Sequence, residues 1–307
     1  MKLTFLGTGA GLPSRQRNVS AIALDLMQEQ GAIWLFDCGE ATQHQILRTS
    51  IKPRKIEKIF ITHLHGDHIY GLPGLLSSRS FQEGKTPVSI YGPKGIKQFI
   101  SISLEISCTK LKYPLHVIEV TDNFYLDTGQ FIIDAIALEH GINGFGYRIM
   151  EKNQRGALQV DKLKDYGIEP GPIYQQIKAN PSTILPDGRE IKREDVIGPD
   201  KQGRKIVIMG DTRNAMQFLD FVAESDLLVH EATFQSTDDQ LAYQYYHSTN
   251  TEVAKLADAV DVKKLVLTHI SARYQGEELK DFKKEAQVYF ENTIIAEDFM
   301  EIEISQS

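Results

Sequence analysis

The densest concentration of chemically versatile side chains in the sequence lies within six residues. His63, His65, Asp67 and His68 form an H-x-H-x-D-H pattern directly after a short apolar run. Alternate side chains of an extended chain point the same way, so His63 and His65 can face one cation, while Asp67 and His68 follow a glycine where the loop turns. Imidazole and carboxylate are the ligands of zinc sites that stay open to water. A lone histidine is more often a core residue, but four such ligands together predict a metal site.

Three further residues of these types closely follow other apolar runs, namely His140, Asp211 and His269. Side chains at strand ends emerge at the rim of a sheet, where functional sites are commonly built. Asp211 is the natural bridging ligand, because a carboxylate has two oxygens and can hold two cations about 3.5–4 Å apart. Taken alone, Asp211 could instead cap the helix that follows it. Capping does not explain why several strand ends carry ligand types.

Other residues suit chemistry on a phosphodiester. Glu231 and His247 are not needed as ligands in this scheme and could form an acid–base pair, although an ion-paired glutamate and a surface histidine are the simpler interpretation. The planar fork of arginine suits phosphate recognition. Candidates for phosphate contact lie in a loop near the glycine-rich start and directly after His269, and they are Arg15, Arg17, Asn18 and Arg273.

The elements that must position these residues can be read from hydrophobic periodicity. We expect strands at residues 2–6, 20–26, 33–38, 58–62, 88–91, 117–120, 131–138, 146–150, 206–210, 227–230, 264–269 and 293–296. We expect helices at residues 40–49, 74–79, 95–104, 215–223, 251–259 and 277–289, the fifth of them beginning at a capping box of Thr249 and Glu252. Because strands outnumber helices and several are hairpin neighbours, an α/β sandwich of two sheets with outer helices is favoured over a parallel doubly wound sheet.

One segment lacks this pattern. From 151 to 205 the strand signal fades and Gly, Pro and charged residues take over, which predicts a weakly structured stretch. The simplest interpretation is a variable surface insertion, and a functional or mobile segment is the alternative. The rest of the chain shows no linker or repeat, so residues 1–307 are expected to form one domain with 151–205 as an insertion.

Composition sets outer limits on function. The 307 residues are 41% hydrophobic and 24% charged, which suits a globular core, and no apolar run approaches the roughly 20 residues of a membrane span. Two cysteines cannot form a disulfide framework, so we expect the reducing cytoplasm. The glycines after residue 6 lack the spacing of a dinucleotide or phosphate-loop motif, so we expect no nucleotide cofactor.

The net charge of −7 argues at first against nucleic acid, but it is an average over unlike regions. Residues 1–58 carry eight basic and five acidic residues, and residues 148–205 carry twelve and nine. Residues 206–307 carry eight and nineteen. A polyanion responds to local potential within a screening length of about 8–10 Å and not to the total charge, so the sequence leaves room for a nucleic-acid substrate.

The ligand pattern resembles that of the metallo-β-lactamase superfamily. The resemblance implies an αβ/βα sandwich with two Zn²⁺ per subunit at one edge of the sheets. It assigns His63, His65 and His140 to one zinc, and it assigns Asp67, His68 and His269 to the other. Asp211 would bridge the two, and Asp67 would also accept a proton. The pattern fixes the class of chemistry and not the substrate.

Over nearly its whole length the chain is similar to the bacterial tRNase Z family, the endoribonucleases that mature the 3′ end of precursor tRNA. The likeness includes the glycine-rich start, the loop of Arg15 to Asn18 and the motif around Glu231. The insertion around Gly171 and Pro172 looks like the protruding flexible arm with which the family grips tRNA. The resemblance also implies a homodimer in which the arm of one subunit serves the active site of the other.

The expected function is therefore a zinc-dependent hydrolase that removes the 3′ trailer from precursor tRNA, leaving a 3′-OH and a 5′-phosphorylated trailer. Asp67, Glu231 and His247 are the expected catalytic residues. A broader phosphodiesterase acting on small or cyclic esters or RNA ends is the alternative. A non-catalytic RNA-binding protein is disfavoured, because every ligand position is filled.

Overall fold

The computed structural model describes residues 1–306, and the chain divides into two compact units. Unit 1 comprises Met1–Met150 and Arg204–Ser305, and unit 2 comprises Glu151–Gly203 with Gln306. No helix among residues 1–306 is both long enough and apolar enough to cross a bilayer. Each unit has its own hydrophobic cluster and is described separately below.

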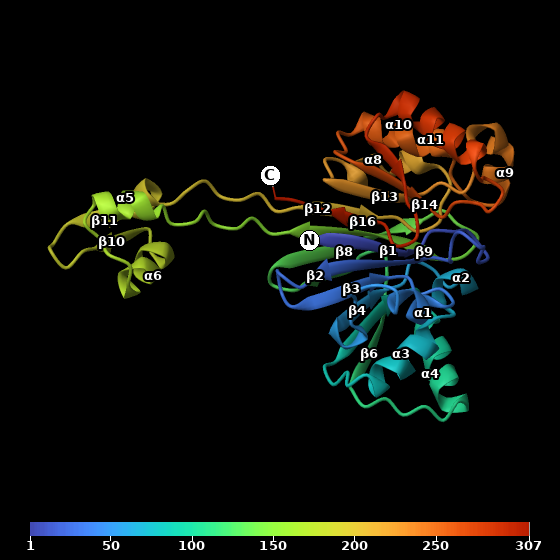
Figure 1. Ribbon diagram of the computed structural model, residues 1–307, viewed down its shortest axis with the longest axis horizontal. Coiled ribbons are helices and arrows are strands. Elements are labelled where there is room, and N and C mark those ends of the chain that lie inside the picture. Colours follow the sequence, from blue (N-terminus) through green and yellow to red (C-terminus); the bar gives the residue numbers. More distant parts are fainter. Residues whose placement is uncertain (307) are drawn as a thin grey trace. The chain divides into compact units, whose positions relative to one another are not determined.

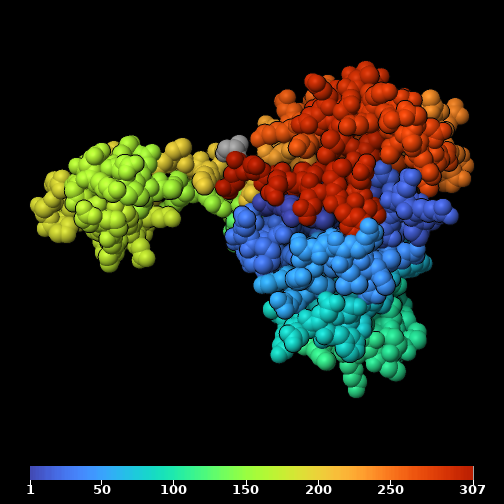
Figure 2. All heavy atoms as spheres, viewed as in Figure 1, coloured from blue at the N-terminus to red at the C-terminus, as the bar shows by residue number. Residues whose placement is uncertain are grey.

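Unit 1 contains two mixed seven-stranded sheets (Figure 1). The first has the order β16-β1-β2-β3-β4-β5-β6, with bounds Glu301–Glu303, Lys2–Gly7, Ala21–Leu26, Ala32–Phe36, Ile56–Phe60, Val88–Gly92 and Leu115–Glu119. The second has the order β15-β14-β13-β12-β9-β8-β7, with bounds Thr293–Ile295, Leu265–Thr268, Leu227–Glu231, Lys205–Ile208, Gly144–Glu151, Phe131–Leu138 and Tyr125–Asp127. Figure 2 colours the earlier residues of unit 1 blue to green and its later residues orange to red. The sheets cross this division, because β7, β8 and β9 belong to the second sheet and β16 belongs to the first.

The two sheets pack face to face through a shared apolar core. Trp34 and Phe36 of the first sheet lie in one buried cluster with Tyr147 and Val229 of the second. The alternate residues of the same strands, such as Leu35, contact the outer layer instead. Both faces of these strands are buried, which explains why they are continuous apolar runs and do not alternate with polar residues.

Helices cover the outer face of each sheet. On the first sheet these are α1 (Thr42–Ile46), α2 (Gly66–Ile69), α3 (Leu72–Phe81), α4 (Ile96–Ile106) and the 3₁₀ turn η1 (Pro53–Lys55). The later part of the chain adds η2 (Ala215–Phe218), α8 (Leu219–Val222), η3 (Ser236–Asp238), α9 (Asp239–Gln244), α10 (Asn250–Ala259) and α11 (Glu277–Tyr289). Several of these pack on the second sheet through the cluster that includes Val253 and Phe282. The expected two-sheet sandwich is therefore confirmed.

Unit 2 is built from short elements around a small core of its own. It contains α5 (Val160–Asp165), α6 (Pro172–Ala179), α7 (Arg193–Val196) and a hairpin of β10 (Ser182–Ile184) with β11 (Glu190–Lys192). Its core is formed by the buried apolar residues Leu163, Ile168, Ile177, Leu185, Ile191 and Val196. The prediction of a weakly structured stretch was wrong, because elements of three to eight residues are too short to show a clear period.

The place where unit 2 is inserted follows from strand pairing in unit 1. β9 and β12 are antiparallel neighbours, with Met150 opposite Lys205. Unit 2 therefore occupies the position of a hairpin loop, and its two connecting segments continue the pairing between Gln154 and Lys201. Because the entropy cost of closing a loop grows only slowly with its length, such an insertion is tolerated at little cost to the sheet.

Individual elements agree with the sequence to different degrees. Residues 131–138 and 277–289 are predicted with their observed bounds, and Thr249 caps α10 by accepting a hydrogen bond from the Glu252 amide at 3.3 Å. The helix expected at 215–223 is instead η2 followed by α8. α2 was expected to be loop, and the three-residue strands β7 and β16 were not predicted.

Candidate active site

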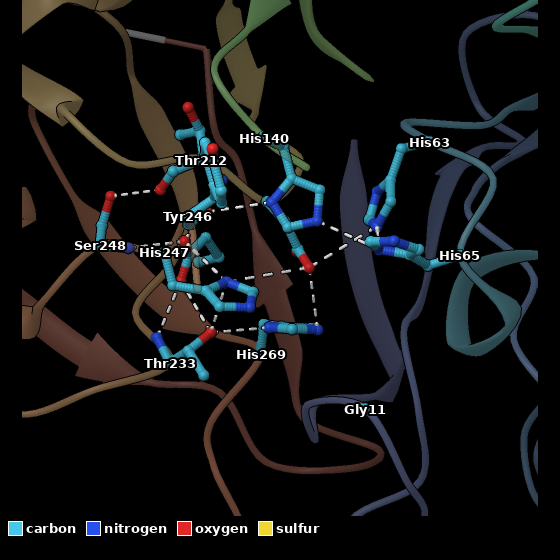
Figure 3. A network of polar contacts seen from close by, with 12 residues as sticks. Gly11, His63, His65, His140, Thr212, Thr233, Tyr246, His247, Ser248 and His269 are labelled. Atoms are coloured by element: carbon cyan, nitrogen blue, oxygen red, sulfur yellow. Dashed lines mark hydrogen bonds and ion pairs between the residues drawn. The ribbon is translucent and has the colours of Figure 1, made fainter. Parts of the chain in front are cut away.

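The histidine pattern lies where the chain leaves β4 and enters α2. His63 and His65 are in the extended connection, and α2 carries Asp67 and His68. The Nε2 atoms of His63 and His140 each lie 3.1 Å from Nδ1 of His65, so three ring nitrogens converge on one point (Figure 3). His140 reaches this point from the loop after β8.

A second group lies beside the first. Nε2 of His269, directly after β14, is 3.3 Å from Oδ2 of Asp67, and Nε2 of His68 is 3.5 Å from the same oxygen. Asp211 lies between the two groups. Its Oδ2 is 3.3 Å from Nε2 of His269, 3.6 Å from His68 and 3.7 Å from His63. The structure thus brings together all seven residues that the sequence singled out as ligands.

The protonation of this cluster suits cation binding. Burial alone would raise the pKa of Asp67 and Asp211, but the surrounding histidines hold the pKa of both carboxyls well below the usual range. Burial, reinforced by the neighbouring His68, holds the pKa of His63 well below its usual value. The site therefore offers ionised carboxylates together with a neutral His63 imidazole, the forms in which these groups can bind a metal. Burial lowers the pKa of His68, but the charges of Asp211 and Asp37 outweigh it and raise that pKa, so a metal bound there would have to displace a proton from this ring.

Whether a metal fits the cluster depends on which ring nitrogen of each histidine carries the proton. Hydrogen bonds to the outer nitrogens decide this for several of the rings. Nδ1 of His68 donates to Oδ2 of Asp37 at 2.7 Å, and Nδ1 of His140 donates to the carbonyl of Tyr246 at 3.0 Å. Nδ1 of His269 lies 2.8 Å from Oγ1 of Thr233. In His68 and His140 this leaves the lone pair on Nε2, facing the cluster, and in His68 that buried atom has no hydrogen-bond partner.

The spacing of the ligand atoms gives the same answer. Ligands about 2.1 Å from a tetrahedral metal lie about 3.4 Å apart. The distances of 3.1–3.7 Å in the cluster bracket that value. The residues therefore fit divalent metal ions. The rings of His63, His68, His140 and His269 each have the outer hydrogen-bond partner that metal-ligating histidines usually have.

Glu231 and His247 form a hydrogen-bonded pair that packs against the metal-ligand cluster. Glu231 ends β13, and its Oε1 accepts from Nδ1 of His247 at 3.2 Å and from the Ser248 amide at 2.7 Å. Its Oε2 accepts from the amide and hydroxyl of Thr233 at 2.8 and 2.9 Å. Burial lowers the pKa of His247, but the charges of Glu231 and Asp211 outweigh it and raise the pKa to about 9. The ring of His247 also stacks on that of His269.

The residues expected to contact phosphate fall into two groups. Arg15 is exposed, and so is Arg273, whose guanidinium lies 5.2 Å from the ring centroid of Phe234. The side chain of Arg17 is buried instead, and its Nη1 donates to Oγ1 of Thr8 at 2.7 Å. Asn18 donates to the carbonyl of Glu40 at 2.9 Å. The sequence shows that an arginine is present but not which way it points, and Arg17 holds its own loop in place.

The glycine-rich start forms a tight turn beside the site. A Cβ at Gly7 would lie 1.7 Å from the carbonyl oxygen of Val19, so only glycine fits there. The amide of Gly11 donates to Oδ2 of Asp67 at 2.9 Å. This turn therefore supports the metal-ligand cluster directly.

Sequence reasoning missed the residues that hold the ligands. Asp37, Thr233 and the carbonyl of Tyr246 are the main ones, and each precedes or follows a strand or helix without belonging to the metal-ligand pattern. Asp37, Tyr246 and His269 all have positive φ, at 56°, 61° and 56°. Backbone in this region is costly for residues other than glycine and clusters at functional sites. The position of Asp37 directly after β3 was the one available signal.

Comparison with known proteins identifies the class of protein to which this fold and site belong. The chain is 33% identical to the short form of human tRNase Z, with a TM-score of 0.70 over 99% of this chain and all of that one. It is 18% identical to the metallo-β-lactamase fold protein YhfI from Bacillus subtilis, with a TM-score of 0.68 over 98% of both chains. The fold and site therefore define a hydrolase of the metallo-β-lactamase fold, a class in which a metal cofactor is expected.

The family follows from nearer relatives. Ribonuclease Z of Oceanobacillus iheyensis is 56% identical over 306 residues, covering 99% of this chain and all of that protein. The family described as anti-Pycsar protein Apyc1 also matches residues 1–141. The chain belongs to the ribonuclease Z family.

Proposed function

We propose that this protein is a zinc-dependent endoribonuclease that removes the 3′ trailer from precursor tRNA. The observation that carries the proposal is the meeting of seven ligand-type residues with the Glu231–His247 pair at one edge of the sandwich. Ribonuclease Z relatives at this level of identity supply the substrate class. The reaction is hydrolysis of one phosphodiester near the discriminator nucleotide, and its products are a tRNA 3′-OH and a trailer with a 5′-phosphate.

Two Zn²⁺ per subunit is the arrangement that the distances favour. His63, His65 and His140 would hold one ion. Asp67, His68 and His269 would hold the other, with Asp211 shared. Divalent cations bound there lower the pKa of water and neutralise charge on a phosphoryl group.

The chain's own residues handle the protons. Asp67 accepts the proton of the attacking water in this proposal, a role that rests on the family resemblance. Attack on phosphorus breaks its bond to the 3′ oxygen of the tRNA, which must then gain a proton. His247 is the donor in this proposal, because Glu231 occupies its Nδ1 and leaves Nε2 for the substrate. Arg15, Arg273 and Asn18 would contact flanking phosphates.

Unit 2 is proposed as the arm that binds tRNA away from the cleavage site. It contains a cavity of about 470 Å³ that is lined by three cations, Arg155, Lys192 and Arg193, and by two carboxylates. Gly171 and Pro172 begin its helix α6. Because every proposed metal ligand and catalytic residue belongs to unit 1, the proposal predicts that tRNA binding and cleavage can be separated.

The homodimer and the cytoplasmic location also belong to this proposal. Both follow from the family resemblance and from the substrate, since precursor tRNA is processed in the cytoplasm of bacteria. Measuring mass by light scattering at micromolar concentration tests the dimer, and a monomer would contradict it.

Mapping the cut decides the main proposal. Metal-loaded protein is incubated with a precursor tRNA that carries a 3′ trailer, and both products are sequenced to the nucleotide. His65→Ala should lose bound metal and cleavage together, whereas His44→Ala, an exposed histidine outside the site, should keep both. Turnover of small phosphodiesters with no cut in the precursor would favour the broader phosphodiesterase instead.

Removing unit 2 tests the arm. Residues 155–200 can be replaced by Asn-Gly, because Gln154 and Lys201 already pair as they would across a two-residue hairpin turn. The shortened protein should bind precursor tRNA more weakly and still hydrolyse bis(p-nitrophenyl) phosphate. An equal loss of both activities would show that unit 2 serves folding and not tRNA binding.

A further inference from the structure

Beside His247, three side chains form a stack that the mechanism above does not use. The guanidinium of Arg213 packs on the rings of both Tyr243 and Tyr246, 4.1 Å from each centroid. Glu139 holds its edge, accepting from Nε at 2.7 Å, and Nη1 donates to the carbonyl of Tyr243 at 3.2 Å. The stack is therefore fixed in orientation before any ligand arrives.

Tyr243 is the open end of this stack. It follows the first turn of α9, and 58% of it is exposed although one face is in contact with the guanidinium. It lines a cavity of about 440 Å³ together with Arg213, Gln240 and His247. Cavities of about 300–1,000 Å³ are the usual size for small ligands, and His247 places this one directly beside the cleavage chemistry.

The charges around the cavity indicate which part of a nucleotide could bind there. Asp239 and Glu252 also line it, while the positive charges of Arg213 and His247 are already paired with Glu139 and Glu231. A phosphate would meet net negative charge there, so the cavity suits the uncharged part of a nucleotide. Asp239 and Gln240 offer hydrogen-bond acceptors and donors to a base edge, and the ring of Tyr243 offers a stacking face.

We propose that this cavity is a nucleobase subsite, in which the base of a nucleotide flanking the scissile phosphodiester stacks on Tyr243. The proposal rests on the proposed function and adds to it a contact that reads the substrate beside the cut. The base would extend the order Tyr246, Arg213, Tyr243 by one layer, while its phosphate stays next to His247.

The chain supplies a matched control. Tyr245 lies two residues further on and is 57% exposed, but it does not line the cavity. We expect Tyr243→Leu to lower kcat/KM for precursor tRNA about 5- to 150-fold, which corresponds to base stacking of about 1–3 kcal/mol. Tyr243→Phe should restore cleavage to within about twofold, because stacking needs the ring and not the hydroxyl. Tyr245→Leu should cleave as the unmodified protein does.

Abasic substrates identify the base and test the mechanism. Precursors lacking the base on the 3′ side or the 5′ side of the cut are compared with the intact precursor. On one of them the unmodified protein should lose the same factor as Tyr243→Leu loses on the intact substrate, and the variant should lose nothing further. Turnover of bis(p-nitrophenyl) phosphate, which has no base, should fall no more in Tyr243→Leu than in Tyr245→Leu.

Several outcomes would overturn the subsite. One is an equal loss of precursor cleavage in Tyr243→Leu and Tyr245→Leu. Another is that Tyr243→Leu loses the same factor on both abasic precursors as on the intact one. The third is a fall in small-ester turnover in Tyr243→Leu that matches its fall for precursor. If the unmodified protein cuts no precursor, the proposed function fails. The subsite can then be tested with thymidine 5′-p-nitrophenyl phosphate, which carries a base. Faster turnover of this ester than of bis(p-nitrophenyl) phosphate, lost in Tyr243→Leu, would support base binding. Equal turnover of the two esters would exclude base binding.

Discussion

Replacing Asp37 with Asn exchanges one oxygen for an NH₂ group behind the metal-ligand cluster. Oδ1 of Asp37 accepts from the Thr62 amide at 2.7 Å, which keeps that atom an oxygen in the variant. The NH₂ group must then occupy the position of Oδ2, which now accepts from Nδ1 of His68 at 2.7 Å and from Oγ1 of Thr62 at 2.8 Å. Asn also tolerates the positive φ of 56° at this position, so the backbone is not strained further.

The exchange reverses the direction of a chain of hydrogen bonds. An NH₂ group facing Nδ1 of His68 forces that nitrogen to accept, which moves the ring proton to Nε2, where a metal would bind. Oγ1 of Thr62 must also accept from the new NH₂ group, so it donates to Nδ1 of His63, 3.1 Å away. The proton of His63 then moves to Nε2 as well. One substitution thereby places a hydrogen on Nε2 of both His68 and His63, where a metal would need a lone pair.

The size of the effect follows from the partners that are lost. Removing the outer hydrogen-bond partner of a metal ligand typically lowers metal affinity about 10- to 100-fold, or about 1.4–2.7 kcal/mol. Because Asp37 controls two ligands, we expect the upper part of that range for Asp37→Asn. Cleavage at limiting zinc should fall by the same factor and recover in part at high zinc.

The assay is zinc titration against a chromophoric chelator, with thermal unfolding of the metal-free protein measured in parallel. Asp25→Asn is the matched control, since Asp25 caps a turn after β2 away from the site. Metal-free Asp37→Asn should unfold close to the unmodified protein, because the hydrogen that His68 gains on Nε2 faces the carboxylates of Asp67 and Asp211, 3.5 and 3.6 Å away. Unchanged zinc affinity in Asp37→Asn, or an equal loss in Asp25→Asn, would refute the reasoning.

Three other predictions concern separate parts of the chain. Arg213→Met should lower turnover of both precursor tRNA and small esters, because Arg213 joins three loops that carry site residues, and unchanged small-ester kinetics would contradict this. Ile177→Ala should cost about 2–5 kcal/mol in the core of unit 2 and abolish amide protection in residues 151–203 only, whereas the exposed Ile184→Ala should not, as hydrogen exchange can show. Burial raises the pKa of the Cys38 thiol to about 12, so at pH 8 iodoacetamide should modify Cys108 alone in the native protein, and mass spectrometry showing two adducts would contradict it.

The parts of the fold that the sequence predicts are those with strong local signals. Strands buried on both faces, such as β3, are continuous apolar runs, and α11 shows helical spacing over its full length. β16 is only three residues long and pairs with β1 at the opposite end of the chain, so no local pattern announces it. The elements of unit 2 were not predicted for the same reason, because its core gathers single apolar residues from four short elements and two loop positions.

In the candidate site, too, some residues could be predicted from the sequence and others could not. The ligand types stand out because histidine and aspartate are rarely repeated at strand ends without a reason, and the structure gathers all seven. Their outer partners do not stand out, since Thr233 and Asp37 are common residues whose role depends on direction alone. Arg17 shows the limit most clearly, because burial turns an expected phosphate contact into an internal hydrogen-bond donor.

The pairing of the chain's two ends has a consequence for synthesis on the ribosome. β1 pairs with β16, and the Ile304 amide donates to the carbonyl of Met1 at 2.9 Å. The candidate ligands are likewise spread from His63 to His269, so they can meet only after most of the chain has been made. A growing chain therefore lacks a complete metal-ligand cluster until residue 269 has been made. Cells that make this protein are thus spared a partly folded nuclease among their nascent RNAs.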